Sequence, residues 1–139
     1  MSADFIDSNV ILYAFDDADP IKRDIADELV SDAIEQGSGV ISFQVVQEVL
    51  NGLVRKFATP ANPTNARRSL EDVLLPLWTV SPSPDLYHRA LDVHDRYMFG
   101  FFDSLIVAAA LSSDCRRLLT EDLQHGQRIE GLTIHNPFA

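Results

Sequence analysis

The chain has 139 residues, 46% of them hydrophobic and 23% charged, which suits one globular domain with a hydrophobic core and leaves no length for two. Eleven Lys and Arg against 21 Asp and Glu give a formal net charge of −10, which excludes a broad basic face for nucleic acid. The single cysteine excludes disulfide scaffolds and cysteine-based zinc sites, and with no apolar run near the roughly 20 residues of a membrane span we expect a cytoplasmic protein without membrane contact.

Strands and helices are predicted to alternate along the first half of the chain. Short β-prone apolar runs predict strands, and apolar residues that recur every three to four positions predict amphipathic helices. In chain order we expect a strand over 5–6, a helix over 10–14, a helix over 21–36, a strand over 40–41 and a helix over 43–57. The stretch TPANPTN, residues 59–65, predicts a surface connection between two helices.

The second half continues the alternation. We expect a helix from 66, a strand over 77–80, helices over 85–97 and 105–111, a strand over 117–120 and a short strand over 133–134. The run LIVAAAL at 105–111 is apolar all round, which is typical of a helix buried on several sides. Such alternation predicts an α/β fold, with residues 1–139 forming a single three-layer α/β/α domain around a central, mainly parallel sheet of four to five strands.

Four acidic residues are predicted to meet at one edge of this sheet. Asp7 directly follows the first strand, Asp122 lies just beyond the strand over 117–120, and Asp103 opens the buried helix. Glu48 lies within the first two turns of the helix that follows the second strand. Because strand C-termini and the N-termini of the following helices share one edge in an α/β fold, we expect these carboxylates to converge.

Each of these acids also has an ordinary structural interpretation. Asp7 and Asp103 suit helix N-caps, Asp122 suits a turn, and Glu48 suits a solvated helix position. The helical wheel places Glu48 at the border of the apolar arc, beside Val45, and leaves its direction open. Asp103 is unusual because aromatic residues precede it and an apolar helix follows, so its carboxylate would lie in a largely dry crevice and need a partner.

A cluster of four carboxylates needs compensating positive charge. At separations of about 5 Å and an effective dielectric constant of roughly 20, each ionised pair repels by about 3 kcal/mol. No Lys or Arg directly follows these strand ends, and all-oxygen ligands favour Mg²⁺ or Mn²⁺, which also bind phosphate oxygens. The cluster therefore predicts hydrolysis of phosphodiester bonds by a metal-activated water. Arginines that suit either local phosphate contacts or solvated surface charge are Arg67, Arg68, Arg116, Arg117 and Arg128.

These motifs resemble those of the PIN domain family, and most closely its VapC-type toxin ribonucleases from type II toxin–antitoxin pairs. The matching segments run the length of the chain: FIDSNVILY with Asp7, QVVQEVLNGL with Glu48, FGFFDSLIVAAAL with Asp103, LLTEDLQHGQ with Asp122, and finally GLTIHNPF. Two positions depart from the pattern, since Gly100 and Phe102 stand where many relatives have Ser and Trp.

The resemblance implies a Mg²⁺- or Mn²⁺-dependent endoribonuclease that cleaves single-stranded RNA. The catalytic metal ligands would be Asp7, Glu48, Asp103 and Asp122. Asn9 and Thr120 match polar positions that orient the site, and the T-x-D pattern favours Asp122 over Glu121 as the ligand, which leaves Glu121 a supporting role. The resemblance also implies a homodimer and a cognate antitoxin protein whose tail inserts near the acids.

Two other functions remain open at this point. A PIN-fold module that binds RNA or a partner without catalysis would keep the fold with its acids misplaced for chemistry. An aspartyl-phosphate phosphohydrolase would use Asp7 as the nucleophile, but such sites usually carry a second Asp two residues later and a helper Lys, whereas Asn9 stands at that position here. His125 is a further candidate for contact with substrate, although a histidine in a polar turn also suits a solvated position.

Overall fold

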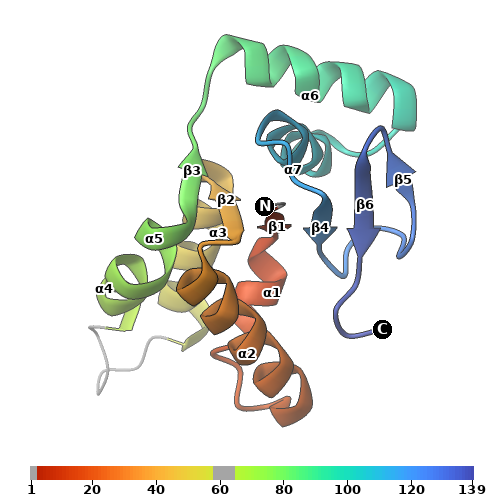
Figure 1. Ribbon diagram of the computed structural model, residues 1–139. Coiled ribbons are helices and arrows are strands. Elements are labelled where there is room, and N and C mark those ends of the chain that lie inside the picture. Colours follow the sequence, from red (N-terminus) through yellow and green to blue (C-terminus); the bar gives the residue numbers. More distant parts are fainter. Residues whose placement is uncertain (1–2, 58–64) are drawn as a thin grey trace.

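The computed structural model describes residues 3–57 and 65–139, and strands alternate with helices along them (Figure 1). In chain order the elements are β1 (Asp4–Ile6), α1 (Ser8–Tyr13), α2 (Pro20–Gln36), β2 (Gly39–Ser42), α3 (Phe43–Gly52) with a π-helical continuation (Leu53–Phe57), α4 (Asn65–Ser69), a π-helical turn (Leu70–Leu74), α5 (Leu75–Leu77), β3 (Trp78–Val80), α6 (Pro84–Tyr97), α7 (Phe101–Ser112), β4 (Arg117–Leu119), β5 (Arg128–Ile129) and β6 (Leu132–His135). The predicted connection over 59–65 lies outside the described residues, apart from Asn65, which begins α4.

The strands form a single, mainly parallel sheet in the order β3-β2-β1-β4-β6-β5. Every neighbouring pair is parallel except β5 and β6, which are antiparallel. The described residues therefore hold six strands where the sequence predicts four or five. The additional strand, β5, has only two residues, so it is too short to produce a periodic signal in the sequence.

Helices cover both faces of the sheet, and the core lies between these layers (Figure 1). Helix α6 packs along α7, while α1 packs against both α2 and α3. Residues 104–111 of α7 are all buried, which confirms the prediction of a helix buried on several sides. Within the described ranges, none of the helices combines the length and apolar character that a bilayer crossing requires. Fully buried side chains of the strands include Phe5, Ile6, Ile41, Leu118 and Ile134.

Side-chain caps fix where the helices begin relative to the sheet. The Ser42 hydroxyl at the end of β2 accepts a hydrogen bond from the Val45 N–H, so α3 starts directly at the strand's carboxyl end. The Asp7 carboxylate does the same for α1 at the end of β1 by accepting from the Ser8 N–H. Gly37 ends α2 in the left-handed conformation with a φ of 64°, directly after the predicted helix over 21–36.

The structure predicts that Gly39 tolerates no side chain. A Cβ at Gly39 would lie 2.8 Å from the Ala33 Cβ and 2.8 Å from Leu77 Cδ2. We expect Gly39→Ala to lower the free energy of unfolding by about 1–3 kcal/mol, because α2 or α5 must shift to make room. The matched control is Gly131→Ala, which meets no atom within 4 Å and should change stability by less than about 0.5 kcal/mol. Urea unfolding midpoints measure both, and equal midpoints for the two variants would contradict the prediction.

Candidate functional site

The register between β1 and β4 brings Asp7 and Thr120 together at the carboxyl edge of the sheet. Ile6 pairs with Leu119, and the Asp7 N–H donates to the Leu119 carbonyl oxygen at 3.0 Å. One residue further along both strands, the Thr120 hydroxyl donates to Asp7 Oδ2 at 2.8 Å. Both side chains are buried, with 5% of Asp7 and none of Thr120 exposed. The end of the strand pair thus places a carboxylate inside the protein.

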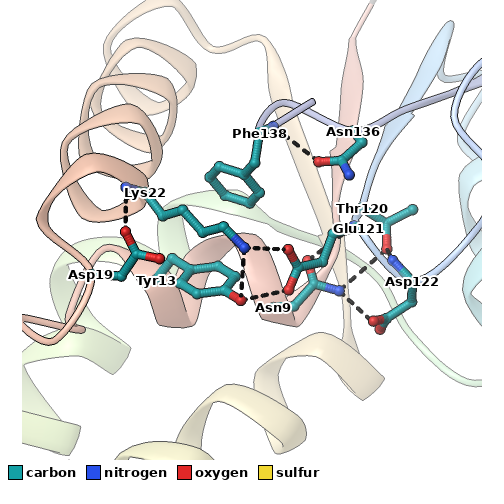
Figure 2. Close-up of polar contacts among 9 residues, drawn as sticks. All are labelled: Asn9, Tyr13, Asp19, Lys22, Thr120, Glu121, Asp122, Asn136 and Phe138. Carbon is teal, nitrogen blue, oxygen red and sulfur yellow. Dashed lines mark hydrogen bonds and ion pairs between the residues drawn. The ribbon is translucent and has the colours of Figure 1, made fainter.

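The Asn9 carboxamide connects this pair to Asp122 (Figure 2). Asn9 Nδ2 donates to Asp122 Oδ2 at 2.9 Å and to the Thr120 hydroxyl oxygen at 3.2 Å, and it lies 3.4 Å from Asp7 Oδ2. The Asp122 N–H in turn donates to the Thr120 hydroxyl oxygen at 3.1 Å. Asn9 and Thr120 therefore stand between two of the predicted acids and are hydrogen-bonded to both.

Glu48 reaches the same edge through Ser8. The Ser8 hydroxyl donates to Glu48 Oε1 at 3.0 Å and lies 3.5 Å from Asp7 Oδ1. Glu48 lies on α3, half-buried and directed toward α1, so the direction that the helical wheel leaves open is set toward the acid cluster. Sequence reasoning does not identify Ser8, and the signal that points to it is its place in Asp7-Ser8-Asn9, three polar residues at the start of α1.

Asp103 enters from α7, on which it lies in the first turn. Gly100 is the N-cap of this helix, so the interpretation of Asp103 as an N-cap is wrong. Asp103 is partly buried, and its pKa is raised first by that burial and then by the negative charge of Asp122. The Asp122 charge therefore disfavours ionisation of Asp103, although the two residues come from different elements.

Burial dominates the ionisation of Asp7. Loss of hydration raises the pKa of this carboxyl from its ordinary 3.8 to about 7, against the opposing hydrogen bonds from Thr120 and the Ser8 N–H. The charges of Glu48 and Asp122 raise it further. Near neutral pH, Asp7 is consequently poised between its protonated and its ionised form, and a nearby positive charge would favour ionisation.

Glu121 points away from these acids and into an ion pair (Figure 2). Lys22 Nζ lies 3.0 Å from Glu121 Oε2, and the Tyr13 hydroxyl donates to Glu121 Oε1 at 2.6 Å. Burial raises the pKa of Glu121, but the bonds from Tyr13 and Lys22 together outweigh it and leave the pKa below its usual value. Sequence reasoning missed Tyr13 and Lys22, because it sought cations only directly after the strand ends.

The donor set suits a hard divalent cation, since the acids at this edge offer only oxygen atoms. Within residues 3–57 and 65–139, however, no three His, Cys, Asp or Glu side chains lie so that together they could hold a metal ion directly. The Ser8 and Asn9 side chains stand between the carboxylates instead. This arrangement fits Mg²⁺ held by one or two carboxylates and several waters, and it does not fit a closed cage of four carboxylates. That all four acids are ligands stays a prediction.

Two other candidates have partners of their own. Arg117 forms a two-pronged ion pair with Asp4 at the start of β4 and β1, at distances of 2.6 and 3.1 Å. This end of the strands lies opposite the acids, so Arg117 is held in an ion pair away from them. His125 Nδ1 accepts a hydrogen bond from the Asn136 N–H at 2.9 Å, which ties this residue to the segment after β6.

Comparison with known protein families identifies the family to which the chain belongs. The profile of the PIN domain matches residues 5–128. The chain belongs to the PIN domain family. This membership confirms the resemblance drawn from the four acidic motifs. It also confirms the predicted three-layer α/β/α fold. No curated protein matches the chain.

Three solved structures share this PIN fold at low sequence identity. A toxin–antitoxin complex from Klebsiella pneumoniae is 20% identical, with a TM-score of 0.67 and 98% of both chains covered. VapBC2 from Rickettsia felis, bound to a DNA fragment from its promoter, is 17% identical, with a TM-score of 0.69 and coverage of 96% of this chain and 98% of that one. VapC20 from Mycobacterium tuberculosis, a toxin that cleaves the sarcin–ricin loop, is 18% identical, with a TM-score of 0.63 and coverage of 86% and 92%.

The raised pKa of Asp7 predicts a pH-dependent stability in EDTA. The folded chain keeps the Asp7 proton up to a pH of about 7, whereas the unfolded chain releases it near 3.8. The stabilisation from that proton is therefore fully present below pH 3.8 and is lost as the pH rises to about 7, a loss of a few kcal/mol. We expect Asp7→Asn, which has no proton to lose, to be less affected.

The measurement compares urea unfolding of wild type and Asp7→Asn at pH 5 and pH 8, both in EDTA. Wild type should lose more stability than the variant between the two values. An equal loss in both proteins would show that Asp7 does not titrate in this window, and that its burial is relieved in solution.

Proposed function

We propose that this PIN domain is a metal-dependent endoribonuclease that hydrolyses RNA phosphodiester bonds. The observation that carries the proposal is the buried Asp7 carboxyl at the sheet edge, with a pKa near neutrality and with Glu48 and Asp122 close enough to raise it. A stabilising role alone does not account for such a group, because burial of an ionisable carboxyl costs free energy. A bound cation would offset that cost, which explains why the acids gather here.

In this proposal the ligands to Mg²⁺ or Mn²⁺ are drawn from Asp7, Glu48, Asp103 and Asp122. When bound, the cation supplies positive potential for the scissile phosphate and an activated water as the nucleophile. The chain's own contribution is to orient these ligands. Thr120 and the Ser8 N–H hold the Asp7 carboxylate, and the Asn9 carboxamide holds Asp122, so little reorganisation accompanies the reaction.

Similar solved structures support a toxin role. VapC20 from Mycobacterium tuberculosis is described as a toxin that cleaves the sarcin–ricin loop, and the Klebsiella pneumoniae structure is a toxin–antitoxin complex. We therefore propose that this chain acts as the toxin of a toxin–antitoxin pair, with RNA as its substrate and a cognate antitoxin as its partner. A homodimer and a cytoplasmic location complete the proposal. A carboxylate-rich edge would attract an arginine from the antitoxin.

A non-catalytic PIN module is the second candidate, and one observation favours it. No three acids among the described residues are arranged to hold an ion directly. If the Ser8 and Asn9 side chains keep their hydrogen bonds when metal is offered, the domain would bind RNA or a partner without cleaving it. The phosphohydrolase interpretation gains nothing, because Lys22 is paired with Glu121, and Asn9, not a second Asp, stands two residues after Asp7.

Metal-dependent RNA cleavage is the first test. Purified protein is incubated with total cellular RNA in Mg²⁺, in Mn²⁺ or in EDTA, beside Asp7→Asn and Asp103→Asn. We expect wild type to cleave in either metal and not in EDTA, and both variants to lose about 100-fold or more of the activity, because each removes a charge that helps to hold the cation. Sequencing of the product ends would identify the cleavage site.

The matched control is Asp27→Asn, which removes the same charge from an exposed position on α2 and should cleave like wild type. Circular dichroism and urea unfolding confirm that each variant is folded. Wild type that binds RNA but cleaves none of it in any metal would overturn the nuclease proposal in favour of the binding module.

The antitoxin partner is tested separately. We expect co-expression with the protein of the adjacent gene to yield a stable complex in size-exclusion chromatography, and we expect that complex to cleave RNA more slowly than the free chain. Light scattering on the free chain measures whether it is a dimer. If the chain and the protein of the adjacent gene elute separately at micromolar concentration, the partner proposal is contradicted. The nuclease proposal would not be affected.

A further inference from the structure

A second charged cluster lies beside the acid site, on the side of Asn9 that is away from Asp122 (Figure 2). It consists of Lys22, Tyr13, Glu121 and Phe138, and we call it the Lys22 clamp. Lys22 Nζ lies 3.0 Å from Glu121 Oε2 and 3.3 Å from the Tyr13 hydroxyl oxygen, and the Tyr13 hydroxyl donates to Glu121 Oε1 at 2.6 Å. Each of the three polar groups thus contacts the other two, and together they join α1, α2 and the segment after β4.

Two aromatic rings flank the Lys22 ammonium of the clamp. The Lys22 ammonium lies 4.7 Å from the centroid of the Tyr13 ring and 5.3 Å from that of Phe138. The two rings meet edge to face with centroids 5.0 Å apart. Only 32% of the Lys22 side chain and 23% of the Glu121 side chain are exposed. An ion pair that is partly desolvated and hydrogen-bonded at both oxygens holds its geometry better than an exposed one.

The clamp and the acid site share helix α1 and the segment that follows β4. The Glu121 N–H donates to Asn9 Oδ1 at 3.5 Å, while the Nδ2 of the same carboxamide donates to Asp122. Tyr13 lies one helical turn after Asn9 on α1, so both side chains lie on the same side of that helix. Glu121 also lies directly between Thr120 and Asp122 in the chain, so fixing Glu121 restrains both neighbours.

We propose that Lys22 and Glu121 are positioning residues of the acid site. By holding Glu121 away from the carboxylates, the clamp fixes the segment 120–122 on α1 and thereby sets the orientation of the Asn9 carboxamide between Asp7 and Asp122. Glu121 is then the counterion of Lys22 and not a ligand of the cation. The effect on turnover rests on the proposed nuclease function, whereas the effect on Asn9 does not.

The test removes the charge of Lys22 and follows both effects. In Lys22→Met we expect the side-chain NH₂ resonances of Asn9 to shift in ¹H–¹⁵N correlation spectra, because the carboxamide loses its fixed neighbour. These resonances are assigned by their absence in Asn9→Asp. We also expect kcat for RNA cleavage to fall about tenfold while KM changes less than about twofold, as a displaced ligand would cause.

The matched control is Arg23→Met, which removes the same charge from the next residue of α2. Arg23 pairs with Asp17 and Asp24, whose side chains are 89% and 75% exposed, and among the described residues no hydrogen bond or ion pair joins its side chain to the clamp. It should leave the Asn9 resonances and kcat unchanged. A rise in KM with constant kcat in Lys22→Met would make Lys22 a phosphate contact and overturn the proposal, as would Asn9 resonances that stay in place.

A charge exchange distinguishes positioning from simple loss of stability. We expect Lys22→Glu and Glu121→Lys each to disturb Asn9, and the double variant to recover most of the wild-type resonances and turnover, because the ion pair is restored in reverse. Additive losses in the double variant would overturn the proposal. If wild type cleaves no RNA at all, the resonances still test the clamp, so failure of the nuclease function and failure of the clamp remain separate results.

Discussion

Parallel pairing of β1 with β4 in one register holds Ile6 beside Leu119, and the acid site depends on that pairing. Because side chains alternate along a strand, a slip by one residue would move Asp7 and Thr120 to different sides and break their hydrogen bond. The hydrophobic core enforces the register, since Ile6 and Leu119 are each at most 1% exposed. The free energy that positions the carboxylate therefore comes from apolar packing, not from the acids themselves.

The protein handles buried negative charge in two different ways at this edge. Glu121 is neutralised by an internal cation, and its pKa stays below the ordinary value. Among the described residues, the hydrogen bonds to Asp7 come from neutral groups of Ser8, Asn9 and Thr120. They do not offset the loss of hydration, so burial raises the Asp7 pKa. The charge of Glu121 is thus compensated within the chain, whereas the Asp7 carboxylate needs a proton or an external cation. That contrast separates the structural acid from the proposed functional one.

Features that depend on hydrophobic periodicity and on strand order could be predicted from the sequence. Helix α7 and the common edge of Asp7 and Asp122 follow from apolar spacing and from the rule that parallel strands end together. Other features depend on side-chain reach, which leaves no local pattern. Lys22 comes from the first turn of α2 to neutralise Glu121, 99 residues away, and nothing near either residue indicates the pair. Strand β5 was missed because two residues carry no period.

The hydrogen bond between Thr120 and Asp7 joins residues 113 positions apart, and so does the bond between Asn9 and Asp122. Contacts of this span form only after the chain between them exists. During synthesis on the ribosome, α1 therefore emerges with Asp7 in water and ordinarily ionised. The acid cluster takes shape only when the segment around Thr120 has left the exit tunnel, so a nascent chain that has emerged only as far as α7 carries an incomplete site.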